Sequence, residues 1–488
     1  MRTSIALLPI LTMIGALIVG ALTTSLTGEV ILIAMLGSAA VASVIAVQRG
    51  RSWDEVQGAA GVQVARVLPA LLILLAIGML IATWMLSGTI PYLVSWGIRL
   101  VNPSHLAIAA FLAAALMSSF TGTSWGSAGT IGVAMMGTAS ALDVSLPMVA
   151  GAVVSGAYFG DKMSPLSDTT IIASVSAELD VYAHIRGMLP TALPSFVMAA
   201  LVYTLLGQRS ASVVYDAATG SAAASVPASG TALLGELSQA FALHWIVLLP
   251  PLVIIVAIMR RVPSLLAITL SSLVAVALAI GLQGTAAFDV MTAIVTGAQV
   301  NDATAHSDMF VRLVERGGLY SMAPTLVIVF AAFLLAGAMT VSGALDVLLA
   351  RLLRVVRSTF ALVTATMTAG LGMVALTSHG GVTMLVVGGL FRDAYRAASV
   401  PPRILSRSLE DSVTITEVLM PWTVSAVFMA TTLGVPTVAY APWAVFCWCG
   451  PVLSLLLAWR SRRAANPPAA ISPLRSPAPA SAPLPSRA

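Results

Sequence analysis

The amino-acid sequence predicts an all-α polytopic membrane protein made of two inverted-topology repeats with discontinuous helices. Three observations predict this fold: the composition, the recurrence of long apolar runs, and an internal repeat. Of the 488 residues, 58% are hydrophobic and 9% are charged, and the mean hydropathy is +0.98. Because a soluble domain carries roughly 25% charged residues, this composition excludes the soluble globular classes.

Apolar runs long enough to cross the roughly 30 Å hydrocarbon core of a bilayer recur along the chain. When shorter and interrupted segments are counted as well, we expect about 11–14 transmembrane segments. The clearest runs are residues 5–22, 30–47, 68–86, 189–206, 245–259, 265–282, 325–341, 360–376 and 441–459.

The two halves of the sequence resemble each other at a nearly constant spacing. Matches at a fixed period, in the same order, are the signature of a structural repeat. The matching pairs are Ser87-Gly88 with Ser342-Gly343, residues 123–126 with 377–380, and Asp161 and Pro165 with Glu417 and Pro421, at offsets of 255, 254 and 256 residues.

The charges of equivalent loops indicate that the second repeat is inverted relative to the first. Loops with an excess of Lys and Arg remain on the cytoplasmic side of a membrane. The loop after the second segment is basic in the first half and mostly acidic in the second, and the next loop reverses this pattern. Both termini are therefore predicted to be cytoplasmic. The basic loop residues are Arg49, Arg51 and Arg66 in the first half and Arg351, Arg354 and Arg357 in the second.

These assignments divide the chain into four parts. Residues 1–207 form the first transmembrane repeat, 208–240 an external linker, 241–460 the second, inverted transmembrane repeat, and 461–488 a cytoplasmic tail. The tail is rich in Pro, Ala and Ser and has no apolar surface with which to form a core, so we expect it to be disordered.

A polar, charged string at residues 155–170 lies between apolar runs and is the strongest functional signal. A charge near the bilayer centre costs roughly 2.5–3.5 kcal/mol on insertion scales, so groups kept there usually mark an ion or substrate path. If the string is one helix, Asp161, Ser164 and Asp168 share a face, and Pro165 frees backbone carbonyls nearby. Such oxygen ligands suit a hard cation. The expected Na⁺ ligands are Asp161, Ser164 and Asp168, with Ser167 and Thr169 in support.

A second carboxylate-rich string lies at residues 408–422. As a helix it places Glu410, Thr414 and Glu417 on one face, next to Pro421. Both halves thus present two carboxylates seven residues apart beside a proline. The alternative is that the first two acidic residues belong to the Arg-rich loop and face water. The candidate ion- or proton-binding residues here are Glu410, Asp411 and Glu417, with Ser412 and Thr414 as supporting ligands.

Two further polar interruptions, at residues 121–130 and 377–383, are candidates for unwound helix. In the first, Thr123 and Ser124 offer oxygens to a cation, although close packing through small residues is the alternative. In the second, His379 is a candidate proton relay, since histidine titrates near neutral pH. Lys162 either joins such a relay by pairing with a carboxylate or extends its ammonium group to the interface. The other four histidines, His184 among them, lie near segment ends and are given no role.

Inverted repeats with interrupted helices are typical of secondary transporters, whose site lies near the middle of the membrane. A carboxylate cluster shielded from water holds a proton or a cation, but not comfortably both. If such a cluster opens to one side at a time, this competition yields coupled cation/proton exchange.

At these residues the sequence resembles the NhaC family of Na⁺/H⁺ antiporters, within the wider ion-transporter superfamily. The resemblance implies a multi-pass antiporter of the bacterial cytoplasmic (inner) membrane that exports Na⁺ in exchange for H⁺ by alternating access. It covers most of residues 30–460. The matching stretches are residues 122–130, 155–170, 409–412, 421–422 and 428–436.

A proton- or sodium-coupled antiporter of small organic acids, such as malate or lactate, on the same scaffold is the alternative function. It would need a fixed positive charge or free helix N-termini to hold a carboxylate, and Lys162 is the only obvious membrane-embedded cation of the first half. Ile171, Val413 and residues 379–381 depart from the family's usual pattern, which leaves the substrate open.

An intramembrane aspartyl protease is the weakest alternative, because Tyr215-Asp216 lies in the polar linker and follows Gly160-Asp161, which is the wrong order for such an enzyme. We therefore expect a transporter and no enzyme, without a cofactor other than the transported ions. The expected partners are the lipid bilayer, Na⁺ and H⁺, with no nucleic acid, and a homodimer is the assembly to be tested.

Overall fold

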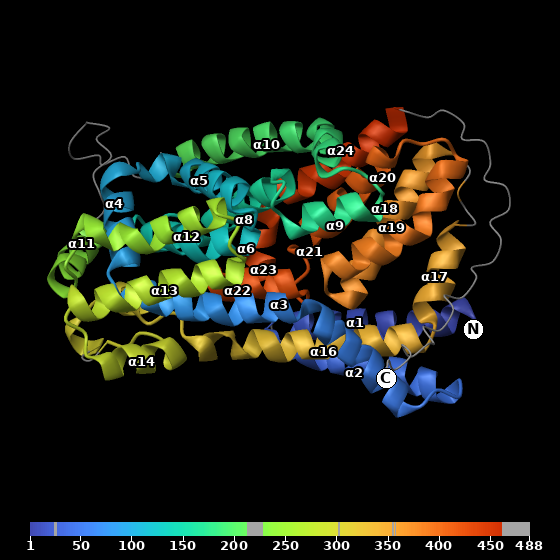
Figure 1. Ribbon diagram of the computed structural model, residues 1–488, viewed down its shortest axis with the longest axis horizontal. Helices are drawn as coiled ribbons and strands as arrows, with labels where there is room; N and C mark the ends of the chain where they lie inside the picture. The colour runs from blue at the N-terminus through green and yellow to red at the C-terminus, as the bar shows by residue number, and fades with distance from the viewer. Residues whose placement is uncertain (24–26, 212–227, 301–302, 354–355, 357, 461–488) are drawn as a thin grey trace, which may run out of the picture.

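The computed structural model describes the chain apart from residues 24–26, 212–227, 301–302, 354–355, 357 and 461–488. Within these ranges the secondary structure is helical and contains no strand, as the sequence predicts. Most of the long helices run along the long axis of the molecule (Figure 1). The predicted tail and the middle of the predicted linker lie outside the described residues.

The described part of the first half contains ten α-helices and two short turns of other helical types. The 3₁₀ turn η1 (Pro103–His105) precedes α5, and the π-helical turn η2 (Ala128–Gly132) joins α6 to α7. The α-helices are α1 (Thr3–Thr23), α2 (Gly28–Gln48), α3 (Trp53–Leu86), α4 (Thr89–Leu100), α5 (Leu106–Thr121), α6 (Ser124–Ser127), α7 (Val133–Ala141), α8 (Leu146–Met163), α9 (Asp168–Ser176) and α10 (Val181–Ala211).

The second half is built in the same way from long helices and short connecting turns. Its 3₁₀ turns are η3 (Trp245–Leu248), η4 (Ala303–Ala305), η5 (Leu319–Met322) and η7 (Ala441–Trp443), and η6 (Glu410–Thr414) is π-helical. Its α-helices are α11 (Ala228–Ala240), α12 (Leu249–Met259), α13 (Ser264–Gly281), α14 (Ala287–Thr296), α15 (Asp308–Val314), α16 (Ala323–Val341), α17 (Ala344–Leu353), α18 (Thr359–Thr377), α19 (Gly380–Ala397), α20 (Pro402–Leu409), α21 (Ile415–Glu417), α22 (Val424–Leu433), α23 (Thr437–Tyr440) and α24 (Val445–Arg460).

Many of these helices are long and apolar enough to span a membrane. The described residues contain eight such helices, and ten if each of two helix pairs, bent by 99° and 87°, is counted as one span. The chain is therefore a polytopic α-helical membrane protein. The predicted 11–14 segments include interrupted helices that this count leaves out, so the exact number of crossings stays a prediction.

The outer surface has the apolar character that a lipid-facing surface requires. Leu22 on α1 and Phe288 on α14 are 82% and 77% exposed, and large apolar side chains on α10 and α13 face outward in the same way. A soluble monomer rarely exposes so much contiguous apolar surface. Inside, the buried apolar side chains form two large clusters, one centred on α3–α8 and the other on α1, α2 and α16–α20.

The helices α3 and α16, which end just before the matching Ser-Gly pairs at residues 87–88 and 342–343, pack against each other in opposite directions. Near the end of α3, the carbonyl of Gly78 accepts a hydrogen bond of 2.7 Å from Gly318, just before α16. Near its beginning, Ala60 lies against Gly337, where a Cβ atom would come within 2.6 Å of the Ala60 nitrogen. Early residues of α3 thus meet late residues of α16, so the two helices are antiparallel. Glycine at both contacts allows the backbones to approach closely.

The segments that follow these two helices lie at opposite ends of the molecule. Figure 1 shows α4, which follows α3, at one end and α17, which follows α16, at the other. The same relationship appears in the hydrogen bonds. The carbonyl of Ser87 accepts one of 3.0 Å from the Gln283 side chain after α13, and the carbonyl of Ser342 accepts one from Arg49 after α2. This arrangement supports the predicted inverted repeat, which stays a prediction for the chain as a whole.

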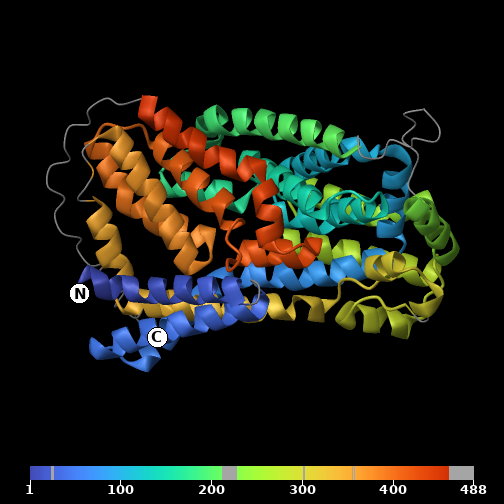
Figure 2. The same ribbon diagram turned by 180° about the vertical axis from the view of Figure 1, so that it is seen from behind.

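Each half also contains a helical hairpin whose tip lies in the interior of the molecule. In the second half, Thr377 and Thr383 hydrogen-bond at the tip at 2.8 Å, and Thr366 of α18 donates to Tyr395 of α19 farther from it. The view from behind shows α18 and α19 side by side (Figure 2). The tips are polar because the chain leaves helical geometry there, which frees backbone groups for ligands or caps.

The predicted linker, residues 208–240, is partly helical. The helix α11 covers its last residues and buries Leu233 and Leu237, and Ser229 donates a hydrogen bond to the carbonyl of Ala141. The sequence reads as a polar linker here because Ala, Ser and Gly dominate, yet two leucines four residues apart supply an apolar stripe.

Candidate functional site

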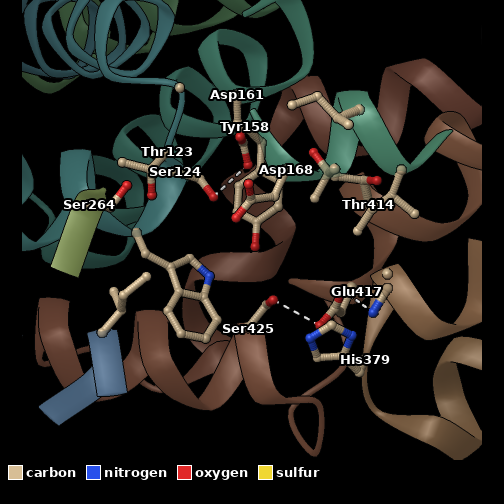
Figure 3. A pocket seen from close by; sticks show the side chains of 18 of the residues that line it. Thr123, Ser124, Tyr158, Asp161, Asp168, Ser264, His379, Thr414, Glu417 and Ser425 are labelled. Atoms are coloured by element: carbon tan, nitrogen blue, oxygen red, sulfur yellow. Dashed lines mark hydrogen bonds between the residues drawn. The ribbon is translucent and has the colours of Figure 1, made fainter. Parts of the chain in front are cut away.

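A cavity of about 350 Å³ lies in the interior where the two hairpin tips meet two helix breaks (Figure 3). It takes side chains from both halves of the chain. The polar residues that line it are Thr123, Ser124, Tyr158, Asp161, Asp168, Thr169, Ser264, His379, Thr414, Glu417 and Ser425. Of the residues predicted from sequence, eight therefore come together here: Thr123, Ser124, Asp161, Asp168, Thr169, His379, Thr414 and Glu417.

Asp161 lies in the last turn of α8 and is 6% exposed. The Ser124 hydroxyl, at the start of α6, donates a hydrogen bond of 2.8 Å to its Oδ2 atom. Thr123 caps α6 by accepting a hydrogen bond from the nitrogen of Gly126. Gly122 takes a left-handed conformation (φ +66°) that favours glycine, and the helix breaks after Thr121. This break places the Ser124 hydroxyl beside the Asp161 carboxylate.

Glu417 ends α21 and is also 6% exposed. Both of its carboxylate oxygens accept hydrogen bonds: Oε2 from the backbone nitrogen of Gly380 at 2.9 Å and Oε1 from the Ser425 hydroxyl at 2.8 Å. Because a buried charge needs hydrogen-bonding partners, these two donors keep Glu417 at the cavity wall.

The surroundings of Asp161 and Glu417 repeat at an offset of 256 residues. Thr123 and His379 both cap the helix after a hairpin tip, and the residues before them, Gly122 and Ser378, are both left-handed. The next residues, Ser124 and Gly380, donate to the two carboxylates. The sequence match of residues 123–126 with 377–380 is therefore out of register by two positions. That match was aligned on the identical Thr-Ser pairs, whereas the backbone conformations align Thr123 with His379.

The string containing Asp161 and Asp168 is not one continuous helix. The helix α8 ends at Met163, and Asp168 is the first residue of α9, whose cap is the hydroxyl of Ser167. Pro165 cannot donate to a helix, and a serine cap stabilises a new start, so the chain breaks between the two aspartates. The expected single helical face is therefore wrong, although both carboxylates still line the cavity.

Two predicted ligands of this string have other local contacts. The Ser164 hydroxyl accepts a hydrogen bond from the nitrogen of Leu166, and Ser167 bonds Thr169 and Thr170. Neither serine is part of the cavity wall, whereas Thr169 is. That Asp161, Ser164 and Asp168 together bind Na⁺ stays a prediction.

The carboxylates Glu410 and Asp411 lie outside the cavity and are fully buried. Residues 410–414 form the π-helical turn η6, which changes the phase of the helix, so Glu410 and Glu417 do not share a face. Burial also rules out the alternative that both acidic residues face water. Ser412 donates to the carbonyl of Ser408 instead of facing the cavity, while Thr414 lines it.

Lys162 forms a buried ion pair with Asp411 that joins the two halves of the chain. Its ammonium group therefore does not extend to the interface. Glu410, which directly precedes Asp411, faces His184 of α10, with 4.0 Å between Glu410 Oε1 and His184 Nε2. Neither of these two side chains has a hydrogen-bond partner among the described residues. His184 is fully buried. Sequence reasoning gave it no role because no local motif surrounds it.

His379 lines the cavity but also has a structural task. Its Nδ1 atom accepts a hydrogen bond of 3.5 Å from the nitrogen of Val382, which caps α19. With Nδ1 acting as acceptor, a neutral ring carries its proton on Nε2.

Three polar residues of the cavity wall, Tyr158, Ser264 and Ser425, were not predicted as site residues. Tyr158 precedes Asp161 by three residues on α8 and so shares its face. Ser425 is the equivalent of Thr169 at the offset of 256, so the repeat itself carried a signal for it. Nearby, Trp125 and Phe428 stack with ring centroids 4.5 Å apart and join the two halves beside the cavity.

The cavity can therefore hold a small hard cation. The carboxylates and hydroxyls that line it are oxygen ligands of the kind that such ions prefer. The same carboxylates can carry protons, so one set of residues has the chemistry for both ions.

Comparison with known proteins identifies the class of transporter. The sequence model described as the "Na+/H+ antiporter family" matches residues 1–207 and 156–461. The chain belongs to this family. An uncharacterized Na⁺/H⁺ antiporter of Haemophilus influenzae is 39% identical over 86% of this chain and 89% of its own length. The antiporter is also similar to the Na⁺/H⁺ antiporter NhaC of Alkalihalophilus pseudofirmus, at 36% identity over 83% and 85% of the two chains.

A third relative of the antiporter is named for different substrates. The malate-2H⁺/Na⁺-lactate antiporter of Bacillus subtilis is 31% identical over 84% of each chain. The family resemblance predicted from residues 122–130 and 155–170 is thus confirmed, and the fold accommodates organic-acid exchange in at least this relative.

Proposed function

We propose that this antiporter exports Na⁺ in exchange for H⁺ and that the interior cavity is the site where the two ions compete. The observation that carries the proposal is the matched placement of Asp161 and Glu417, one from each half, with hydroxyl and backbone donors on both. A proton on either carboxylate removes a negative charge that Na⁺ needs, and a bound Na⁺ disfavours protonation. Exchange follows if the cavity opens to one side at a time.

The inverted repeat supplies a physical route to such alternating access. The antiparallel pair α3 and α16 and the two hairpin tips support a scaffold in which each half supplies one of two equivalent gates. Small movements of one half against the other would then expose the cavity first at one end and then at the other. Asp168, Glu410 and Asp411 are proposed as further proton-binding groups outside this central pair.

The setting that we propose is the bacterial cytoplasmic membrane, with both termini on the cytoplasmic side. The Arg-rich turns support this orientation, because the Arg49 turn lies beside the end of α16 and beside the start of the Arg351 segment. We further propose that the antiporter acts as a carrier without enzyme activity or a cofactor, and that a homodimer is its assembly.

Exchange of an organic acid is the second candidate, supported by the 31% identity to the malate/lactate antiporter. It is the weaker one, because no Lys or Arg is found among the described residues that line the cavity. Lys162, the cation expected to hold a carboxylate, is paired with Asp411.

Proton flux in proteoliposomes distinguishes the two functions. Purified antiporter is reconstituted with a pH gradient reported by a pH-sensitive dye, and NaCl, LiCl, KCl, malate and lactate are added separately. We expect NaCl or LiCl alone to collapse the gradient. Collapse only in the presence of an organic acid would overturn Na⁺/H⁺ exchange in favour of the second candidate.

A further inference from the structure

A second cavity, of about 440 Å³, lies between α3, the end of α22 and the segment that leads into α16. It lies toward the end of the molecule where Figure 1 shows α14, away from the end with α17, whose last turn contains Arg351. Residues Glu315, Arg316, Tyr320, Met322, Thr432 and Gly434 are among those that line it. Ser425 of the first cavity and Thr432 of the second lie on the same helix, so about 10 Å of α22 separates them.

The Arg316 guanidinium is fixed in this cavity but only partly satisfied. Its Nε atom donates to the carbonyl of Arg312 at 3.0 Å. Its Nη1 atom is buried and has no hydrogen-bond partner among the described residues. Gly434 leaves the space the guanidinium occupies, because a Cβ atom there would lie 3.3 Å from Nη2.

Thr432, which also lines this cavity, carries a second unused donor. It is 3% exposed, and its hydroxyl has no partner among the described residues. Its neighbour Thr431 is fully engaged, with hydrogen bonds to the carbonyl of Val427 at 2.9 Å and to Thr325 at 3.0 Å. Buried donors are normally satisfied, so two unused donors in one cavity indicate a ligand that accepts hydrogen bonds.

We infer that this cavity binds a small monocarboxylate, held by the Arg316 guanidinium and the Thr432 hydroxyl. A guanidinium matches the planar geometry of a carboxylate and binds it through charge-assisted hydrogen bonds. The carboxylate of Glu315 lines the same cavity and is exposed. It disfavours a second negative charge on the ligand, so a monocarboxylate fits better than a dicarboxylate. Ile81 and Met322 supply apolar wall for a short carbon chain.

This site goes beyond the proposed Na⁺/H⁺ exchange and does not depend on it. It is built from other residues, and it lies toward the end of the molecule that the charge distribution assigns to the outside. An external carboxylate would therefore reach it before the central cavity.

Calorimetric titration of the full-length antiporter in lipid nanodiscs, with lactate as the probe and without Na⁺, tests the inference. We expect saturable lactate binding to the native protein. Removal of a charge-assisted hydrogen bond typically weakens binding by about tenfold or more, so Arg316→Gln should weaken it at least that much. Thr432→Val, which keeps the shape but removes the hydroxyl, should weaken it by several-fold. Arg312→Gln is the matched control, since Arg312 is exposed four residues earlier and does not line the cavity.

The other outcomes overturn the inference. Absence of lactate binding to the native protein would show that the cavity is not a monocarboxylate site. Binding that Arg316→Gln and Thr432→Val leave unchanged would place lactate elsewhere. Tighter binding of malate or chloride than of lactate would contradict a monocarboxylate site. Should Arg316→Gln fail to fold, Thr432→Val and Thr432→Ser decide, because only the serine retains the donor. Na⁺/H⁺ flux is measured separately, so a failure of exchange is distinguishable from a failure of this site.

Discussion

Asp161 and Glu417 lie 256 residues apart in the chain, and each accepts a hydrogen bond from the residue 37 positions before it. For Asp161 the donor is the Ser124 hydroxyl, and for Glu417 it is the nitrogen of Gly380. Each donor begins the helix that follows a hairpin tip. The two halves of the antiporter thus bring one carboxylate each to a common cavity by the same local structure.

Gly380→Ala should impair exchange through Glu417. A Cβ atom at this position would lie 2.5 Å from Glu417 Oε2, so the carboxylate must move away from its donors. Loss of a hydrogen bond to a charged group is worth about 1.5–3 kcal/mol, which predicts an apparent Na⁺ affinity weaker by about tenfold or more. Gly372→Ala in α18 is the matched control, because nothing lies within 4 Å of its added Cβ. Equal Na⁺ affinity in the two variants would contradict the Glu417 contact.

Removing one charge of the Lys162–Asp411 ion pair should destabilise the protein more than removing both. Lys162→Met leaves the fully buried Asp411 without a partner, which typically costs about 3–5 kcal/mol. The double variant Lys162→Met/Asp411→Leu removes both charges and should recover most of that loss. The midpoint of thermal unfolding in detergent measures both effects. A double variant no more stable than the single one would show that the ion pair is not the source of the loss.

Asparagine at position 379 should preserve exchange. The ring of His379 caps α19 through Nδ1, and an asparagine side chain can accept the same backbone hydrogen bond without titrating near neutral pH. His379→Ala should instead lower stability by about 1 kcal/mol, the usual value of a helix cap. Proteoliposome flux and thermal unfolding are compared for both variants. Loss of exchange in His379→Asn at full stability would support the proton-relay role predicted from sequence.

A disulfide should form between Ala60→Cys and Gly337→Cys once Cys447 and Cys449 are replaced by alanine. A Cβ built on Gly337 lies 3.1 Å from that of Ala60 and 2.6 Å from the Ala60 nitrogen, so the two helices must separate slightly before the two Cβ atoms reach the 3.5–4.5 Å of a typical disulfide. The control pair, Ala60→Cys with Ser321→Cys, places the second cysteine at the opposite end of the α16 segment and should not link. Gel mobility under oxidising and reducing conditions distinguishes them. Linkage of the control pair alone would contradict the antiparallel packing of α3 and α16.

Orientation is tested with a membrane-impermeant thiol reagent in intact cells. Arg51→Cys lies in the exposed turn between α2 and α3, and Ser238→Cys lies on the exposed face of α11. The positive-inside rule predicts labelling of Ser238→Cys only. Labelling of Arg51→Cys in sealed cells would invert the proposed topology.

The sequence was sufficient to predict the class of fold and to single out Asp161 and Glu417, which both line the cavity, because apolar length and charges embedded in apolar runs are visible in the sequence itself. It failed where a few residues change helix geometry. Ser167 caps a new helix beside Pro165, and that interruption separates Asp161 from Asp168. The π-helical turn at 410–414 turns Glu410 away from Glu417.

Contacts between distant segments could not be read from the sequence at all. The pairing of Lys162 with Asp411, and the position of His184 opposite Glu410, join residues more than 200 positions apart that no motif connects. Arg316 belongs to the mostly acidic loop of the second half, where no motif marks it, although it lies in a cavity with Thr432.

The central claim is that Asp161 and Glu417 form the site shared by Na⁺ and H⁺. Na⁺-driven proton flux in proteoliposomes, measured for Asp161→Asn and Glu417→Gln beside the control Asp143→Asn, tests it most directly. Asp143 is exposed and its left-handed backbone suits asparagine. We predict that each cavity variant inserts and folds but loses exchange, while Asp143→Asn exchanges as the native protein does. Normal exchange by either cavity variant would contradict the account.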